Sequence, residues 1–278
     1  MGTYYAIVTC RNSEANIAEA LYSLKEQILK PVYVIVIDDG SKDNTPEILK
    51  KIQSGWSSLY TITNPDLGYD IGRVVSNWNK AIRFARDAGL PATDYHMIST
   101  DDTVYDPDYA EKVVRYMDDN LEIAVASGNY EEQKVVTPHG AGRFVRSTFF
   151  DRHHGLYPEK MGYESLVLHT AMQQGYKFAV LDEARFVHSR PLGKNHHFYE
   201  FGASMRTLGY HPLFALGRFF LYFVSGRPIG RLGAIYMLYH YLSYRPKVAG
   251  YDSMHDEEIR RYIRKHQLSR VRRKLGWA

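Results

Sequence analysis

The sequence is poor in cysteine and has no long uninterrupted apolar run. Its single cysteine, Cys10, cannot form an intrachain disulfide, and this usage favours a reducing compartment. The opening residues, MGTYYAIVTCRN, lack the basic stretch and apolar run of a signal peptide, so we expect a first β-strand there. The 278 residues contain neither internal repeats nor low-complexity tracts, and this length predicts one large domain or one domain with an extension.

Acidic side chains are absent from the end of the chain. Residues 259–278 carry eight Lys/Arg and no Asp/Glu, so leaving them out changes the formal net charge from +4 to −4. This asymmetry predicts an anionic partner for the basic end. No RNA-binding or helix-turn-helix pattern accompanies the basic residues, so nucleic acid is not expected as that partner.

Short apolar segments rich in β-formers alternate with helical patterns along the first 100 residues. Such alternation implies an α/β fold with a mostly parallel sheet, in which ligands bind beyond the carboxyl ends of the strands. We expect strands at 4–9, 32–37, 59–63 and 95–99, and helices after Ser13, from Thr45 and over 74–88. Farther along, the patterns predict helices at 109–119 and 164–174, strands at 123–127 and 178–181, and an irregular stretch at 137–155.

Two of the expected strands end in paired aspartates. Asp38-Asp39 follows the second strand, where a carboxylate can accept a hydrogen bond from a nucleotide base or a ribose hydroxyl. Asp101-Asp102 follows the fourth strand, and adjacent carboxylates repel each other unless a cation lies between them. Hard oxygen ligands of this kind suit Mg²⁺ or Mn²⁺ together with substrate phosphates. Taken alone, either pair could instead cap the following helix or form a turn.

Together, these motifs resemble those of the family 2 glycosyltransferases of GT-A fold, over about residues 3–190. The matching residues are Ile7-Val8-Thr9 with Asn12, Ser23-Leu24 with Gln27, Val36 to Ser41 with Asp43 and Thr45, Asn79 with Ala81, and Thr100-Asp101-Asp102 with Pro107-Asp108. The resemblance implies a Rossmann-like, mostly parallel mixed sheet flanked by helices. It also implies an inverting hexosyltransferase that moves a sugar from a UDP- or GDP-sugar to an acceptor hydroxyl.

The resemblance also assigns roles to residues at the strand ends. It implies that Asp39 binds the nucleotide base, that Asp101 contacts the ribose, and that Asp101 and Asp102 hold Mn²⁺ or Mg²⁺. Thr9 and Arg11 belong to the same donor-binding edge. Arg11 replaces the aromatic residue usual in the family, and its guanidinium could stack on the base or reach a phosphate. The metal would stabilise the departing nucleoside diphosphate.

Residues of the second half complete the implied site. The segment Gly162 to Ser165 resembles the family's Glu-Asp motif, so Glu164 is the expected base that deprotonates the acceptor hydroxyl. An acidic residue in the first turn of a helix is the structural alternative. His188 stands where many members carry a histidine and is a candidate metal ligand, although a lone histidine is more often structural.

Three arginines are further candidate contacts. Arg73 follows a Gly/Asp-rich loop and could reach the phosphates or base of the donor, with a solvent-facing side chain as the alternative. Arg143 and Arg146 lie in the stretch expected to be irregular and could face the acceptor or the diphosphate.

Two apolar, aromatic stretches follow the expected catalytic region. Leu213–Val224 has twelve residues and Leu232–Leu242 has eleven, both well short of the about 20 that a membrane-spanning helix needs. Phe, Tyr and Leu with flanking arginines suit helices that lie in the membrane interface, and the basic end suits anionic lipid headgroups. A helical hairpin packed on the catalytic domain, or a homodimer interface, is the alternative.

The sequence therefore predicts a GT-A domain at 1–205, with a donor and metal half at 1–110 and an acceptor half at 111–205, followed by a helical, amphipathic and basic extension at 206–278. We expect a glycosyltransferase, peripheral on the cytoplasmic face of the cell membrane, that acts on a glycan or polyprenyl-linked acceptor. A non-catalytic membrane-bound scaffold of this fold and a nucleotidyltransferase remain alternatives. The latter usually needs a Gly-rich, Lys/Arg-containing signature near the first strand, which this chain lacks.

Overall fold

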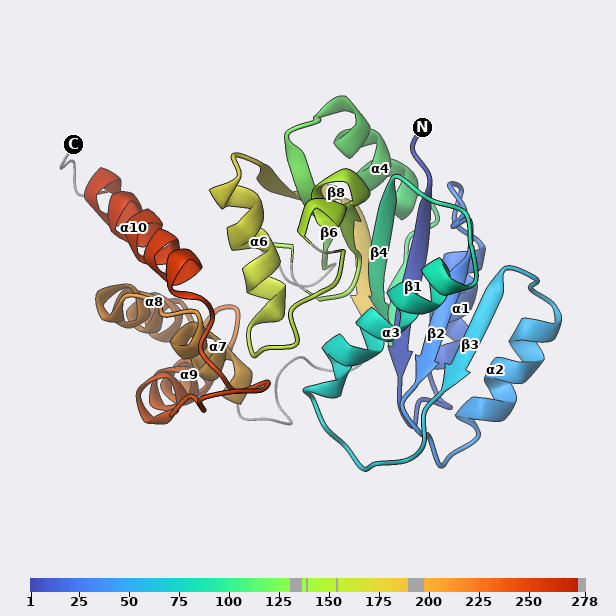
Figure 1. The fold of residues 1–278 in the computed structure, drawn as a ribbon, viewed down its shortest axis with the longest axis horizontal. Coiled ribbons are helices and arrows are strands. Elements are labelled where there is room, and N and C mark those ends of the chain that lie inside the picture. Colours follow the sequence, from blue (N-terminus) through green and yellow to red (C-terminus); the bar gives the residue numbers. More distant parts are fainter. Residues whose placement is uncertain (131–136, 139, 154, 190–197, 275–278) are drawn as a thin grey trace. The chain divides into compact units, whose positions relative to one another are not determined.

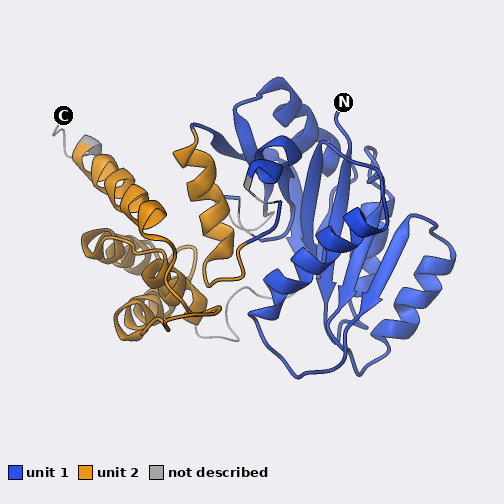
Figure 2. Ribbon diagram, in the orientation of Figure 1, with its two compact units in different colours: residues 1–157, 175–190 blue, residues 158–174, 191–278 orange. Residues whose placement is uncertain are grey.

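The computed structural model describes residues 1–130, 137–138, 140–153, 155–189 and 198–274. The chain divides into two compact units (Figure 2). Unit 1 comprises residues 1–157 and 175–190, and unit 2 comprises residues 158–174 and 191–278. The helix that contains Glu164 is therefore grouped with the carboxy-terminal helices, while the catalytic-domain boundary near residue 205 stays a prediction.

In the residues described, unit 1 is built on an eight-stranded mixed sheet with the order β3-β2-β1-β4-β7-β6-β8-β5 (Figure 1). Its strands are β1 Tyr4–Cys10, β2 Val34–Asp38, β3 Leu59–Thr63, β4 Tyr95–Thr100, β5 Thr103–Tyr105, β6 Ile123–Tyr130, β7 Arg143–Arg146 and β8 Lys177–His188. β1 pairs in parallel with β2 and β4, and β2 pairs in parallel with β3, as the sequence predicts. β7 is antiparallel to β4 and β6, β5 is antiparallel to β8, and β6 is parallel to β8.

Helices cover both faces of the parallel half of the sheet (Figure 1). The strand β2 is buried along its whole length, which requires an apolar layer on each side because side chains alternate between the faces. The helices α1 Ile17–Lys25, α2 Thr45–Ser54 and α4 Tyr109–Asp119 share a core with Ala6 and Val8 of β1. The helix α3 Arg73–Asp87 contacts β1 and β2 from the opposite face.

Two strands of the sheet were not predicted. β5 has three residues, and β7 lies inside the stretch 137–155 that was expected to be irregular. That expectation was wrong because β7 is only four residues long and has an arginine at each end, so it carries no clear apolar alternation. Pairing with β4 on one side and β6 on the other holds it in the sheet. The short helix α5 Ser147–Phe150 follows it directly.

Unit 2 is helical in the residues described. Its helices are α6 Tyr163–Gln173, α7 Tyr199–Thr207, α8 Pro212–Ser225, α9 Gly230–Ser243 and α10 Glu257–Lys274. Their shared core includes Met205, Ala215, Met237, Tyr241 and Ile263. Within the described ranges, no helix combines the length and the apolar character needed to cross a membrane.

The helices α7 and α9 approach each other closely at Gly202. A Cβ atom on Gly202 would lie 2.4 Å from the carbonyl oxygen of Met237 and 2.6 Å from the backbone nitrogen of Tyr241. Both are backbone atoms of α9, so neither can swing aside as the end of a flexible side chain could. The packing of unit 2 therefore requires glycine at this position.

Replacing Gly202 with alanine should destabilise the protein by about 1–3 kcal/mol, the usual cost of overpacking a close contact. Gly217→Ala in α8 is the matched control, because nothing lies within 4 Å of its added Cβ. Alanine in a helix interior is favoured over glycine by roughly 0.5–1 kcal/mol, so the control should gain stability. Urea unfolding measures both, and equal free energies of unfolding would contradict the close approach.

Candidate active site

The carboxyl ends of four parallel strands meet at one edge of the sheet in unit 1. Cys10 lies beside Asp38 in register, and the half-buried Thr9 lies beside Thr100. Beyond these strand ends the chain continues into Arg11, Asp39, Asn64 and Asp101. The predicted donor-binding residues, which are distant in sequence, are thus gathered at one edge by the register of the strands.

Asp39 is a buried carboxylate held by a network of donors. Arg73, the first residue of α3, donates from Nε at 3.1 Å and from Nη2 at 2.9 Å to Oδ2 of Asp39. Asn64 donates to Oδ1 at 3.2 Å. Burial acts to raise the pKa of Asp39, but the hydrogen bonds from Arg73, Asn64 and Asn77 outweigh it and hold the pKa below its usual range. The side chain is therefore ionised at neutral pH and serves as an acceptor.

Arg11 ties three loops together. Its Nη1 donates to the carbonyl oxygens of Asp39 and Gly40, and its Nη2 donates to Oδ1 of Asp66 at 2.6 Å. Lys42 binds the other oxygen of Asp66 at 2.6 Å, and these two cations lower the pKa of that carboxyl. Gly40 has a φ of +73°, and a Cβ there would meet the backbone of Asp66 at 2.6 Å. The guanidinium predicted to serve the donor thus fixes the loops of the sheet edge.

Asp101 and Asp102 follow β4, as the sequence places them, and have different surroundings. Asp101 is 7% exposed and accepts a hydrogen bond from the hydroxyl of Ser13, in the loop after β1. Asp102 accepts a hydrogen bond of 2.8 Å from Thr100 through Oδ1. The same Oδ1 lies 3.6 Å from Nδ1 of His188.

His188 is brought beside Asp102 by strand pairing. β5 and β8 are antiparallel, with Thr103 directly opposite His188. The hydroxyl of Thr103 lies 2.8 Å from Nδ1 of the imidazole, which fixes the orientation of the ring. The sequence indicated His188 by resemblance only, whereas the pairing with the unpredicted strand β5 explains its position.

The donor set at this edge is suited to a divalent metal that also binds substrate. Carboxylate oxygen and imidazole nitrogen are both ligands for Mn²⁺, and carboxylate oxygen suits Mg²⁺. Among the described residues, no group of three or more His, Cys, Asp or Glu side chains is arranged to hold a metal unaided. Asp102 and His188 would therefore need further ligands, and the phosphate oxygens of a nucleotide are of the required kind.

Arg143 and Arg146 contribute to packing in unit 1. Arg143 is fully buried, with its guanidinium carbon 5.4 Å from the ring centre of Trp78 and 5.6 Å from that of Tyr157. Arg146 donates to the carbonyl oxygens of Met117 at 2.5 Å and Ile123 at 3.1 Å, and so links the end of α4 to the sheet. These contacts explain the packing of both arginines, while a role toward an acceptor or a diphosphate stays a prediction.

Glu164 lies in the first turn of α6 in unit 2, after Gly162, whose φ of 88° favours glycine. Burial raises the pKa of Glu200 in α7 to about 7, and the charge of Glu164 acts in the same direction. In the described structure Oε1 of Glu200 is buried without a hydrogen-bond partner. Glu164 and Glu200 are thus electrostatically coupled carboxyl groups within one unit, and no sequence motif pointed to Glu200.

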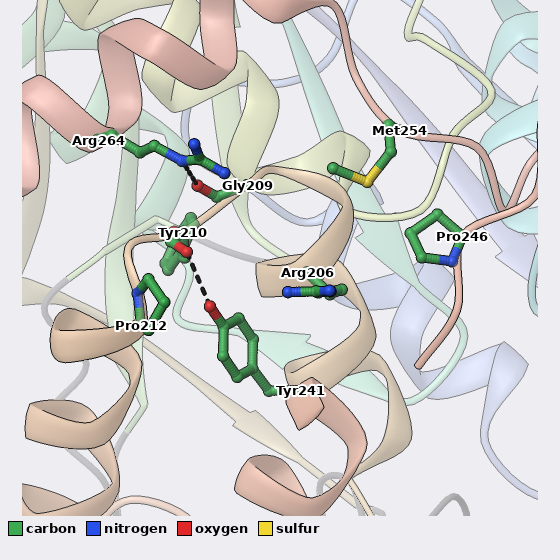
Figure 3. A pocket seen from close by; sticks show the side chains of 8 residues that line it. All are labelled: Arg206, Gly209, Tyr210, Pro212, Tyr241, Pro246, Met254 and Arg264. Atoms are coloured by element: carbon green, nitrogen blue, oxygen red, sulfur yellow. Dashed lines mark hydrogen bonds between the residues drawn. The ribbon is translucent and has the colours of Figure 1, made fainter. Parts of the chain in front are cut away.

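A pocket of about 290 Å³ in unit 2 contains none of the predicted site residues (Figure 3). Arg206 and Arg264 line it, and both make other contacts. Arg206 lies over the ring of Tyr241 at 5.9 Å, and Arg264 donates to the carbonyl oxygen of Gly209 at 2.7 Å. The pocket adds positive charge to unit 2 but no acid or nucleophile.

Sequence reasoning also missed several residues at the sheet edge. Asn64 directly follows β3, so the rule that pointed to the acids after β2 and β4 could have found it. Ser13 and Thr103 gave no signal, because Ser13 contacts Asp101 and Thr103 contacts His188, and both partners are distant in sequence.

Comparison with solved structures identifies the fold as GT-A. A mannosyltransferase from Pyrobaculum calidifontis, PcManGT, solved with GDP-Man and Mn²⁺, matches 85% of this chain and 70% of its own, with a TM-score of 0.57 and 16% identity. TarS residues 1–349 from S. aureus, solved with UDP-GlcNAc, matches 86% of this chain and 71% of its own, with a TM-score of 0.55 and 17% identity. At these identities the likeness concerns the fold alone.

The family model described as glycosyl transferase family 2 matches residues 5–184. The chain belongs to this family, as the resemblance predicted. EpsH of Bacillus subtilis (strain 168), which is called a glycosyltransferase, is 26% identical over 121 residues. That match covers 44% of this chain and about a third, 32%, of EpsH.

The raised pKa of Glu200 predicts a pH-dependent stability. Its folded-state value of about 7 lies above the ordinary value of 4.5, so the stability it contributes is full below pH 4.5 and is lost as the pH rises through 7. Glu200→Gln mimics the protonated side chain, so the variant should melt above wild type at pH 8, by roughly 2–4 °C for ~1 kcal/mol. The difference should shrink at pH 5, as measured by thermal unfolding.

Glu257→Gln, at an exposed position of α10, serves as the control and should follow the wild-type pH profile. A melting difference between Glu200→Gln and wild type that is the same at both pH values would contradict the raised pKa.

Proposed function

We propose that this glycosyltransferase moves a hexose from a UDP- or GDP-sugar to an acceptor hydroxyl, with inversion at the anomeric carbon. The observation that carries the proposal is the convergence of an ionised Asp39 and the Asp102–His188 pair at one edge of the sheet. The contents of the neighbouring structures, GDP-Man with Mn²⁺ and UDP-GlcNAc, support a nucleotide-sugar donor.

Asp39 would recognise the base of the donor. Uracil and guanine both carry a ring N–H, and a carboxylate kept ionised by Arg73 suits either one. Asp101, buried beside Ser13, would contact the ribose. Thr9 and Arg11 border the same edge and would complete the donor site.

Asp101, Asp102 and His188 would hold Mn²⁺ or Mg²⁺, with phosphate oxygens as further ligands. When bound, the ion supplies positive charge that stabilises the leaving nucleoside diphosphate. Thr100 and Thr103 would keep Asp102 and the imidazole in position through their hydrogen bonds.

Glu164 would act as the base. In a single displacement, the bond between the anomeric carbon and the donor phosphate oxygen breaks while the acceptor oxygen bonds to that carbon. The proton of the acceptor hydroxyl passes to the Glu164 carboxylate, and one base is sufficient for this step. The carboxyl of Glu200 supports the assignment, because the charge of Glu164 adds to the burial that raises its pKa, and interacting carboxyl groups are typical of proton-transfer sites.

The acceptor would be a glycan at the membrane, such as a polyprenyl-linked one. Residues 206–278 combine aromatic helices with basic residues, and this composition supports a peripheral position on the cytoplasmic face. A homodimer formed through these helices is the alternative for the same segment.

Nucleotide binding tests the donor site. Asp39→Ala should weaken UDP or GDP binding about tenfold or more, with or without Mn²⁺, because it removes a charged acceptor worth ~1.5–3 kcal/mol. Asp102→Ala should weaken only the part of the nucleotide affinity that depends on Mn²⁺. Isothermal titration measures both, with Asp87→Ala, exposed at the far end of α3, as the control. Wild-type affinities for UDP and GDP in Asp39→Ala, with and without Mn²⁺, would refute the base-binding role.

Transfer assays test the base. Glu164→Gln should lower transfer by roughly 10²–10⁴-fold, the usual contribution of a general base, without changing nucleotide affinity. Glu257→Gln again provides a matched exposed control. Full transfer by Glu164→Gln would contradict the assignment of Glu164 as the base. Absence of Mn²⁺-dependent donor hydrolysis in wild type would favour a non-catalytic scaffold over an enzyme.

A further inference from the structure

The hairpin of α8 and α9 carries two exposed apolar stripes. They consist of Leu213, Leu216, Phe220 and Val224 on α8, and of Leu232, Ile235, Tyr239 and Leu242 on α9. All eight side chains are between 40% and 75% exposed. Their spacing of three and four residues places each set along one face of its helix.

The stripes are not required by the core of unit 2. The opposite side of α8 supplies Ala215 to the core, and that of α9 supplies Ala234, Met237 and Tyr241. Each helix is therefore apolar on two sides, of which only one is buried. A row of exposed apolar side chains on each of two adjacent helices favours an interaction site.

The segment that carries the stripes contains cations and no carboxylates. Between residues 201 and 251 the sequence has no Asp or Glu. Arg227 and Arg231 are exposed where α8 turns into α9, and Arg245 is exposed just after α9. Guanidinium groups at the ends of short apolar helices match the phosphates of anionic lipids.

The helix α10 does not offer a comparable apolar face. Ile259 and Ile263 are packed in the core of unit 2, and Gln267 accepts a hydrogen bond from the backbone of His211 at 2.9 Å. Its exposed side carries basic residues such as Lys265 and Arg270. This helix can attract an anionic surface but has little to insert into it.

We propose that the α8–α9 hairpin is the element that enters the membrane, lying in the plane of an anionic bilayer interface. The two stripes enter the boundary between headgroups and acyl chains, and Arg227, Arg231 and Arg245 bind lipid phosphates. Each helix has 14 residues, which fits an interfacial rather than a spanning position. The inference rests on the proposed membrane location of the enzyme and identifies the surface responsible.

A second copy of the chain fits this face less well than a bilayer does. A two-fold dimer brings the same patch of both subunits together. Because residues 201–251 contain no carboxylate, the exposed arginines of one copy would meet those of the other without compensation. Lipid phosphates supply the missing negative charge.

Sedimentation of the full chain with vesicles of phosphatidylcholine and phosphatidylglycerol tests the inference. Phe220→Gln/Leu242→Gln removes one large side chain from each stripe and should lower the partition coefficient at least about tenfold, because both side chains lose apolar burial. Ile28→Gln/Leu121→Gln is the matched control in unit 1, with wild-type exposures of 64% and 71% against 60% and 68%. It should bind as wild type does.

Three results would overturn the inference, and they differ in meaning. Equal vesicle binding by wild type and Phe220→Gln/Leu242→Gln would mean that the basic helix α10, and not the hairpin, is responsible for binding. A wild type that ignores vesicles would also remove the proposed membrane location. A dimer in solution that the variant dissociates, without vesicle binding, would assign the face to a second copy. Nucleotide affinity, measured on the same proteins, reports separately on the donor site.

Discussion

Negative charge at the carboxyl edge of the parallel strands is the constraint around which unit 1 is arranged. Arg73 compensates Asp39, and the hydroxyl of Ser13 binds Asp101. The thiol of Cys10 responds to the same charge, since its pKa is raised first by burial and then by the surrounding carboxylates. A nucleoside diphosphate is itself anionic, so a divalent cation beside Asp101 and Asp102 would reduce the repulsion between these carboxylates and its phosphates. The charge balance of the site thus supports the proposed metal, as do the donor atoms available.

The parallel half of the sheet could be predicted because local patterns determine it. β2 is an unbroken apolar run ending in Asp38, and helical patterns separate it from its neighbours. The antiparallel half could not be predicted in the same way. Arg143 in β7 is fully buried against Trp78 and Tyr157, whereas a sequence pattern treats arginine as a surface residue. Only the completed fold supplies the aromatic rings that accommodate its side chain.

The residues of the candidate site likewise fall into those that local sequence patterns predict and those that depend on distant contacts. Acids at strand ends can be identified from the sequence, because parallel strands deliver their carboxyl ends to one edge. Their partners cannot, because the contacts join loops that are far apart in sequence. His188 meets Asp102 only because β5 pairs with β8, and Arg11 contacts Asp66 across 55 positions of the chain. Glu200 belongs to no motif, and its raised pKa arises from burial among the helices of unit 2.

The two units differ in charge in the way that their proposed substrates require. A donor that arrives from solution as a metal complex suits an acidic, strongly hydrogen-bonded edge such as that of unit 1. An acceptor held in a bilayer suits a surface without carboxylates, and the α8–α9 hairpin has none between residues 201 and 251. Carboxylates near the hairpin would be repelled by anionic lipid, which would weaken membrane binding. The proposed base, Glu164, lies in α6 outside that segment, and its charge adds to the burial that raises the pKa of Glu200 to about 7.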